Sequence, residues 1–320
     1  MTMTADAGAA DAPAAEAPLQ TVYRPSAPVD LRATVGMLRR GPGDPTMVID
    51  GSVIWRALRT PLGPATLALR AGGGGEIRAT AWGAGAEHAL DSVPSLCGAD
   101  DDPTGFDPSR HPLIAEVARR SPGLRLARTG VVFDALACAI LEQKVTGLEA
   151  FRAWRMLVTK FGERAPGPTP RPMYAAPAAP QWRRIPSWDW HRVAVQPPQS
   201  KTIVRVAERA DSISRALLNA PTGEERDRAL TSFPGVGVWT SAETRIRALG
   251  DPDAVSVGDY HLAHEVGHAL TGHRTDDDGM LELLAPWAGH RQRVIRLIFA
   301  SGVSEPRRGP RLSPEDHRGR

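Results

Sequence analysis

A short turn with two glycines, Phe-Pro-Gly-Val-Gly at residues 233–237, constrains the fold of this chain more than any other stretch. The sequence predicts that one helix ends near Phe233 and that another begins at residue 238 or 239 and runs to residue 249. Gly250, followed two residues later by Pro252, is a typical helix stop signal. We therefore expect two helices joined by a tight turn, inside a mainly helical part of the molecule.

The two glycines give this turn a second property. Glycine adopts positive φ without steric cost and lets a backbone approach a ligand closely. The helix that begins after the turn also has free N–H groups and the positive end of its dipole. Gly235, Val236 and Gly237 are thus predicted to hold phosphate groups of DNA without reading bases. On this motif alone, the alternative that the glycines only close a corner between helices stays open.

A carboxylate follows the turn at a distance of about twenty residues. A short extended segment, residues 255–257, is predicted to lead to Asp259 at the start of a further helix. Aspartate is a favoured helix cap because its oxygen accepts an N–H of the first turn, so Asp259 alone indicates a cap. Next to the glycine turn a catalytic role is favoured, and the two roles are compatible because a cap holds the carboxylate in place.

The chain resembles the helix–hairpin–helix DNA glycosylase superfamily, in particular its bacterial inducible 3-methyladenine (AlkA-type) branch. The matching residues are 233–237, 239–240 and 258–260, together with the helix that contains Phe133, Leu136 and Ile140 and precedes Gln143. The similarity covers most of residues 108–300. It implies a mainly α fold: a helix–hairpin–helix DNA glycosylase body with a small N-terminal α/β antiparallel-sheet domain.

The resemblance assigns a role to each matching position. Asp259 is the catalytic carboxylate, which stabilises the positive charge that develops on the sugar as the N-glycosidic bond breaks. The expected walls of the base pocket are Trp239, Tyr260 and Trp287. The expected DNA contacts come from the turn and from the segment that fills the gap left by an extruded base: Gly235, Val236, Gly237, Gln143, Lys144 and Thr240. Which of these last residues is the wedge stays open.

The lysines of the chain decide the reaction subclass. Glycosylases with lyase activity in this superfamily have a Schiff-base lysine just after the hairpin, and that place is Trp239 here. The only lysines are Lys144, Lys160 and Lys201, so a nucleophilic amine is missing where it would be needed. The sequence therefore predicts a monofunctional hydrolase for alkylated purines of the 3-methyladenine type, acting in base excision repair.

The same resemblance predicts no cofactor and no metal in the site, apart from a monovalent cation that the hairpin is able to bind. The two cysteines, Cys97 and Cys138, are too few for a four-cysteine iron–sulfur cluster. The sequence departs from the family pattern at Glu243, Arg296 and Lys144, where aromatic or apolar residues are expected. These departures leave the range of released bases open.

Composition fits a DNA-repair enzyme without requiring one. The net charge is +3, which permits binding of damaged double-stranded DNA. Arginines expected among the phosphate contacts are Arg152, Arg245, Arg247 and Arg293. The sequence has no long apolar run and no secretory signal, so no membrane span is expected. With the glycosylase resemblance, we expect a monomer in the cytoplasm, associated with the nucleoid.

The chain is expected to divide into four parts. Residues 1–27 are an Ala/Pro-rich tail that composition predicts to be disordered, and residues 304–320 form a second disordered tail. Residues 28–107 are the α/β domain and residues 108–303 the glycosylase domain. Strands are predicted at residues 53–58, 65–70 and 77–82.

Two other functions compete with this interpretation. His264-Glu265-Val266-Gly267-His268 is a literal H-E-x-x-H, which on a helix would place two zinc ligands on one face with Glu265 as the base of a metalloprotease. His261 adds a third histidine, but the longer protease pattern fails at Thr271 and Arg274. The second alternative is a helix–hairpin–helix protein that binds DNA without catalysis.

Overall fold

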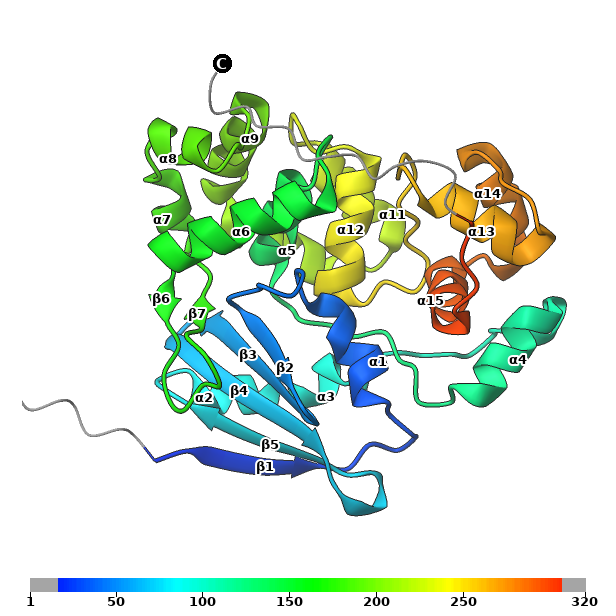
Figure 1. The fold of residues 1–320 in the computed structure, drawn as a ribbon, viewed down its shortest axis with the longest axis horizontal. Helices are drawn as coiled ribbons and strands as arrows, with labels where there is room; N and C mark the ends of the chain where they lie inside the picture. Colours follow the sequence, from blue (N-terminus) through cyan, green and yellow to red (C-terminus); the bar gives the residue numbers. More distant parts are fainter. Residues whose placement is uncertain (1–16, 307–320) are drawn as a thin grey trace, which may run out of the picture.

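The computed structural model describes residues 17–306 of the chain. Its lower layer is a five-stranded antiparallel sheet with strand order β1-β5-β4-β3-β2 (Figure 1). The strands predicted at residues 53–58, 65–70 and 77–82 are present as β3, β4 and β5. The five strands are β1 (Leu19–Tyr23), β2 (Met47–Asp50), β3 (Val53–Thr60), β4 (Gly63–Ala71) and β5 (Ile77–Trp82).

The first strand corrects the prediction of a disordered tail at residues 1–27. Leu19–Tyr23 is the edge strand β1, paired with β5 from Leu19 opposite Ala81 to Tyr23 opposite Ile77. The Ala/Pro-rich composition of the whole segment hid a short stretch that contains β-branched and aromatic residues and can pair with a free sheet edge. Residues 1–16 of the predicted tail lie outside the described residues.

One face of the sheet is covered by short helices. The helix α1 (Leu31–Val35) is capped by Asp30, whose carboxylate accepts the backbone N–H of Ala33 at 2.8 Å. The helices α2 (Ala86–Asp91) and α3 (Val93–Leu96) complete this cover and share a buried core with the central strands. Burial of Leu67 and Leu69 in that core, both fully inaccessible, holds the layers together.

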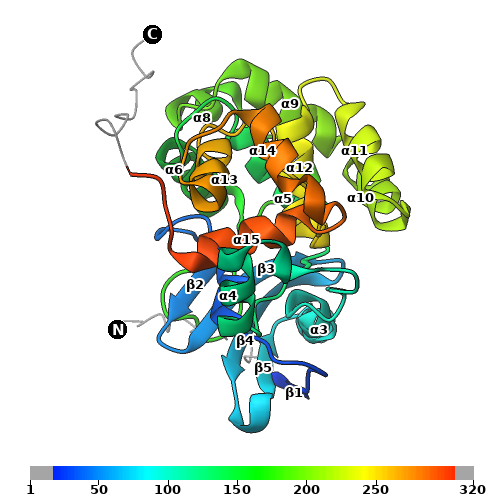
Figure 2. The same ribbon diagram turned by 90° about the vertical axis from the view of Figure 1, so that its right-hand side faces the viewer.

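The rest of the chain is a helical body with two lobes, each built around its own buried core. The first lobe contains α5 to α12, and the second contains α4 together with α13, α14 and α15. The helices are α4 (Pro112–Arg120), α5 (Val132–Leu141), α6 (Gly147–Phe161), α7 (Ala179–Arg183), α8 (Ser187–Arg192), α9 (Pro197–Ala207), α10 (Ala210–Asn219), α11 (Gly223–Thr231), α12 (Val238–Leu249), α13 (Leu262–Thr271), α14 (Asp277–Leu284) and α15 (Arg291–Ser301). Figure 2 shows α4 against α15, although they are far apart in the sequence.

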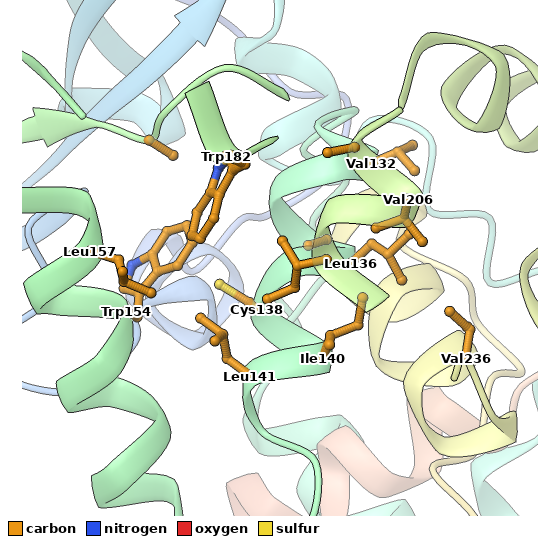
Figure 3. Packing of buried hydrophobic residues seen from close by; sticks show 14 of the residues in the cluster. Val132, Leu136, Cys138, Ile140, Leu141, Trp154, Leu157, Trp182, Val206 and Val236 are labelled. Carbon is orange, nitrogen blue, oxygen red and sulfur yellow. The ribbon is translucent and has the colours of Figure 1, made fainter. Parts of the chain in front are cut away.

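The first lobe packs around α5, the most apolar helix of the body. Leu136 and Ile140 are fully buried on it and face side chains from neighbouring helices (Figure 3). Trp182 stacks between Trp154, at 6.1 Å, and Trp190, at 5.8 Å between ring centroids. These rings fix the proline-rich connection after α6, which also forms the small ribbon β6 (Glu163–Arg164) and β7 (Tyr174–Ala175).

The hairpin helix is placed by this first lobe. The helix α12 begins at Val238 and ends at Leu249, and the left-handed conformation of the following Gly250 (φ 61°) confirms the predicted stop signal. Among residues 17–306, no helix combines the length and the apolar character that crossing a bilayer requires.

The carboxyl group of Asp134, in the first turn of α5, lies near arginines of the sheet, so its titration reports on the packing between the sheet and the helical body. Burial raises the pKa of Asp134 to about 6, although Arg59 and Arg56 of β3 oppose the shift. The folded state therefore binds the proton more tightly than the unfolded chain, whose pKa is near 3.8. Protonated Asp134 therefore contributes to the free energy of unfolding at low pH, and this contribution is lost as the pH rises from about 4 to about 6.

We predict that the Asp134→Asn variant lacks this loss because an amide does not titrate. The free energy of unfolding of the wild type should fall relative to the variant by about 1–3 kcal/mol between pH 4 and pH 7. Urea unfolding of both proteins at several pH values measures the difference. A difference that is the same at every pH would contradict the proposed burial of this carboxyl group.

Candidate active site

The turn between α11 and α12 is held in one conformation by close packing. Gly235 has φ 91°, a value that side chains with a Cβ rarely adopt. A Cβ added there would lie 2.3 Å from the hydroxyl oxygen of Thr202 on α9. Gly237 is different, because a Cβ added there would meet no atom within 4 Å. Only the first glycine is therefore demanded by the fold, and the second faces open space.

Two side chains donate hydrogen bonds to carbonyl groups of this turn. Gln143 donates from Nε2 to the carbonyl of Gly235 at 2.9 Å, and Arg205 donates from Nη1 to the carbonyl of Pro234 at 2.8 Å. The backbone N–H groups of residues 237–240 have no acceptor among residues 17–306. The turn thus has its carbonyls satisfied and its N–H groups free, which suits an anion at the start of α12.

Three of the predicted DNA contacts support the turn instead of projecting from it. The side chains of Thr240 and Val236 are only 2% and 5% exposed. Gln143 also donates to the Thr240 hydroxyl at 2.8 Å, so both amide hydrogens of Gln143 are used. The prediction that the side chains of Gln143 and Thr240 reach DNA is therefore wrong, because both pack against the turn. Val236 is predicted to act through the backbone of the turn, and its N–H already donates to the carbonyl of Phe233 at 3.0 Å. Lys144 does project: it is exposed and has φ 54° at the end of α5.

Asp259 joins the two lobes of the helical body. One carboxylate oxygen accepts the backbone N–H groups of His261 and Leu262, at 2.9 and 3.0 Å. The other accepts the indole N–H of Trp239, in the first turn of α12, at 3.1 Å. The predicted cap position is wrong, because α13 begins at Leu262 with His261 as its N-cap. The Asp259 carboxylate nevertheless accepts the N–H groups at the start of this helix. The side chain is half-buried, between exposed Gly258 and exposed Tyr260.

The aromatic residues expected around a base differ in their environments. Trp239 is partly buried beside Asp259, as its hydrogen bond requires. Tyr260 is 74% exposed and packs edge-on against the His261 ring at 4.8 Å. Trp287 is 5% exposed and donates its indole N–H to the carbonyl of Asp107 at 2.8 Å. The prediction that Trp287 lines a base pocket is wrong, because its ring is part of the core of the second lobe.

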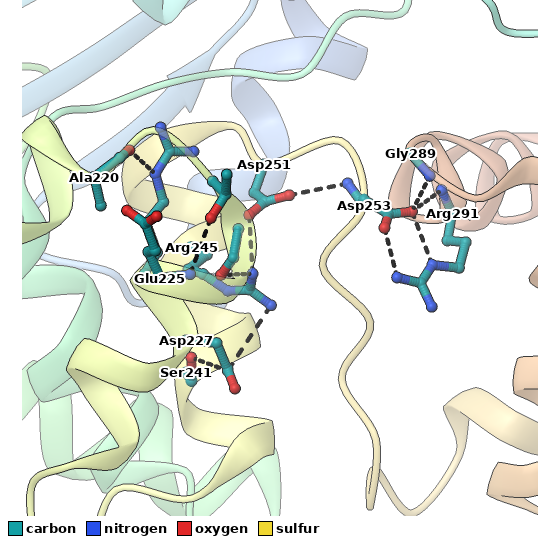
Figure 4. Close-up of polar contacts among 12 residues, drawn as sticks. Ala220, Glu225, Asp227, Ser241, Arg245, Asp251, Asp253, Gly289 and Arg291 are labelled. Atoms are coloured by element: carbon teal, nitrogen blue, oxygen red, sulfur yellow. Dashed lines mark hydrogen bonds and ion pairs between the residues drawn. The ribbon is translucent and has the colours of Figure 1, made fainter.

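A polar network fixes the segment that carries Asp259 (Figure 4). Arg245 donates to the carbonyl of Gly223 at 2.8 Å and to Asp251 at 3.2 Å. Asp253 accepts the backbone N–H of Gly289 and the Nε–H of Arg291, both at 2.8 Å, which ties the segment to the start of α15. The segment from α12 to Asp259 is therefore anchored in both lobes.

The same contacts correct part of the predicted arginine set. The guanidinium group of Arg245 contacts Gly223 and Asp251 in the network of Figure 4, and its side chain is only 12% exposed. Arg293 forms a buried ion pair with Asp101 at 2.7 Å. Arg247 is paired with Glu243. Of the arginines predicted to contact phosphate, only Arg152 is exposed.

The overall arrangement matches that of known proteins. The structure superimposes on 3-methyladenine DNA-glycosylase from Archaeoglobus fulgidus with a TM-score of 0.72 and 17% sequence identity, over 88% of this chain and 98% of that one. The chain has the fold of the helix–hairpin–helix DNA glycosylases. This confirms the predicted fold class, including the N-terminal antiparallel sheet.

Sequence comparison gives similar proteins over a shorter range. The chain is 25% identical over 179 residues to the DNA-3-methyladenine glycosylase of Bacillus subtilis, covering 55% of this chain and 59% of that protein. It is 31% identical over 165 residues to the probable bifunctional transcriptional activator/DNA repair enzyme AlkA of Mycobacterium tuberculosis, covering 49% of this chain and 30% of that protein. Each match thus spans less than two thirds of the relative. No family model matches the chain.

Within this glycosylase fold, the H-E-x-x-H motif has a structural use. The Nδ1 atom of His264 lies 2.8 Å from the carbonyl oxygen of Thr275. The two carboxylate oxygens of Glu265 accept the Ser304 hydroxyl at 3.0 Å and the Glu305 backbone N–H at 2.9 Å. In the part of the chain that the structure describes, no three His, Cys, Asp or Glu side chains converge as metal ligands do. The metalloprotease interpretation receives no support from these contacts.

The contact with Glu265 also corrects the predicted tail at residues 304–320. Ser304 and Glu305 are docked on α13, and Glu305 forms an ion pair with Arg274 at 2.9 Å. Residues 307–320 of that tail lie outside the described residues. Sequence patterns did not single out Arg205 either, because its contact with the turn depends on the packing of α9 and has no local signal.

The two glycines of the hairpin provide a matched stability test. We predict that Gly235→Ala lowers the free energy of unfolding by about 2 kcal/mol or more, through the strained φ and the contact with Thr202. Gly237→Ala should cost less than about 1 kcal/mol, because its backbone is unstrained and its surroundings are open. Denaturant unfolding of both variants measures these values. Equal losses in the two variants would contradict this account of the turn.

Proposed function

We propose that this protein is a monofunctional DNA glycosylase that hydrolyses the N-glycosidic bond of alkylated purines, of the 3-methyladenine type, in double-stranded DNA. The reaction is the first step of base excision repair. The observation that carries the proposal is the bond between Trp239 and Asp259, which fixes one carboxylate beside an anion-binding turn. The names of the sequence relatives, DNA-3-methyladenine glycosylase and AlkA, support the same chemistry.

In the proposed mechanism the turn binds the DNA backbone next to the damaged nucleotide. The free N–H groups at the start of α12 bind a phosphate, and Arg205 holds the turn from behind. The nucleotide must leave the base stack before its sugar reaches the carboxylate, as for glycosylases in general. The exposed side chain of Lys144 fills the space that the extruded base leaves in the duplex.

Asp259 then acts on the extruded nucleotide. Cleavage of the N-glycosidic bond develops positive charge on the sugar, and a fixed carboxylate stabilises that charge. Its three hydrogen bonds hold it before the reaction begins, so it does not need to reorganise. The carboxylate also orients or deprotonates the attacking water. The ring of Trp239, with Tyr260 beside it, offers an electron-rich wall to a cationic methylated base.

No step of the mechanism uses a metal, a cofactor or a lysine nucleophile. Trp239 occupies the place of the Schiff-base lysine, and Lys160 is paired with Asp189 on the first lobe. We further propose that the protein acts as a monomer in the cytoplasm, at the nucleoid. Its two domains are the sheet domain, which includes β1, and the helical body, which includes Ser304 and Glu305. The monovalent cation at the hairpin remains a hypothesis, since the carbonyls of Pro234 and Gly235 already accept side-chain N–H groups.

The variant Asp259→Asn tests the proposed chemistry. Asparagine still caps a helix but carries no charge. We predict that the variant folds, binds methylated DNA and releases damaged bases at least about 100-fold more slowly. Mass spectrometry of bases released from DNA treated with a methylating agent gives the rate.

A matched control is Asp276→Asn, which changes the cap of α14, where the carboxylate accepts the Gly279 N–H at 3.0 Å. This control should keep full activity. Full activity in Asp259→Asn would show that the carboxylate is not catalytic. A wild-type protein that binds methylated DNA but releases no base would favour the binding protein without catalysis.

Borohydride trapping tests the predicted absence of lyase chemistry. We predict no covalent adduct when the protein is reduced on a damaged duplex or on an abasic site, because Trp239 stands at the place of the Schiff-base lysine. A glycosylase with known lyase activity serves as the positive control. An adduct that maps to Lys144 and disappears in Lys144→Ala would contradict the monofunctional mechanism.

A further inference from the structure

A second carboxylate lies on the same face of α12 as Trp239. Glu243 follows Trp239 by one helical turn, which places the two side chains about 5–6 Å apart. One oxygen of Glu243 accepts the Ser256 hydroxyl at 2.6 Å, three residues before Asp259, and the other is paired with Arg247. The side chains of Glu243 and Arg247 remain 14% and 19% exposed. Glu243 is therefore fixed in orientation, close to the catalytic carboxylate, and still reachable.

Two guanidinium groups, that of Arg247, which is paired with Glu243, and that of Arg296, which lies near Arg247, have donors without an acceptor. The Nε–H groups of Arg247 and Arg296 are buried and have no partner among residues 17–306. Arg296 projects from α15 and donates from Nη2 to the carbonyl of Ala33 at 2.7 Å, so its position is set by α1. Burial lowers the pKa of Arg296, and the charge of Arg247 lowers it further, so the two cations lie near each other. Buried donors of this kind are expected to meet an acceptor when a ligand is bound.

The donors and acceptors of this cluster have a definite pattern. An ionised carboxylate offers about four lone-pair sites, and contacts with Ser256 and Arg247 use two of them. Glu243 thus has capacity to accept two further N–H groups, next to guanidinium groups that donate. A guanine-type base presents N1–H and an N2 amino group as donors beside the O6 acceptor. An adenine-type base presents the reverse, with an amino group at C6 and an acceptor at N1.

We propose that Glu243, with Arg247 and Arg296, recognises the Watson–Crick edge of an extruded guanine-type base. The proposal rests on the proposed glycosylase function and specifies which alkylated purine the site favours. Glu243 accepts N1–H and the N2 amino group, while a guanidinium donates to O6. Among alkylated purines, 7-methylguanine is therefore selected over 3-methyladenine by this side of the site.

The test uses one duplex methylated with dimethyl sulfate, which contains both 7-methylguanine and 3-methyladenine. Release of each base by the full-length protein is followed by mass spectrometry. Glu243→Gln keeps the size of the side chain but turns an NH2 group toward N–H donors. We expect it to lower 7-methylguanine release at least tenfold and to change 3-methyladenine release less than threefold. The control Glu282→Gln, on the exposed side of α14, should leave both rates unchanged.

A second variant guards against a purely structural effect. Arg296→Lys retains the positive charge but removes the Nε–H, and it should also reduce 7-methylguanine release more than 3-methyladenine release. Equal loss of both bases in Glu243→Gln and Arg296→Lys would overturn the recognition role and leave the cluster structural. Loss confined to 3-methyladenine would overturn it as well. Release of neither base by the wild type would instead refute the proposed function itself.

Discussion

The hydrogen bond between the Trp239 indole and Asp259 is the interaction on which the site depends. Trp239 belongs to the hairpin helix α12 of the first lobe, and Asp259 precedes α13 of the second lobe. Each lobe has its own apolar core, so packing within a lobe does not fix the distance between an anion bound at the turn and the carboxylate. This bond, together with the anchored segment between them, sets that distance.

Local sequence patterns predicted the elements that local interactions create. The hairpin and the limits of α12 follow from glycine conformation and helix stop signals, which act within a few residues. The sequence could not show that Trp287 is buried or that Gln143 faces the turn. Those outcomes depend on side chains more than ninety positions away, as the bond from Gln143 to Gly235 does. The strand at residues 19–23 was missed for the same reason, since its partner is β5.

Several charged side chains of the helical body and of its junction with the sheet are buried, and they are held by specific partners. Glu243 is paired with Arg247 and with Ser256, and Arg40 is paired with Glu142 at the junction of sheet and body. Such pairs contribute little net stability, because desolvation offsets their attraction. What such pairs provide is orientation. They hold hydrogen-bonding groups at fixed angles, whereas an apolar wall would offer no hydrogen-bonding group. The departures from the family pattern at Glu243 and Arg296 therefore change the chemical character of one wall while the fold is kept.

The docking of Ser304 and Glu305 on Glu265 has an electrostatic consequence. Glu265 lies in the first turn of α13, six residues after Asp259 in the sequence, and accepts hydrogen bonds from Ser304 and Glu305. A chain shortened before Ser304 would leave this carboxylate without the two donors that partly screen its charge. An unshielded acid there would repel the approaching polyanion, and most strongly in dilute buffer. The C-terminal segment thus acts as a cover over a negative charge beside the site.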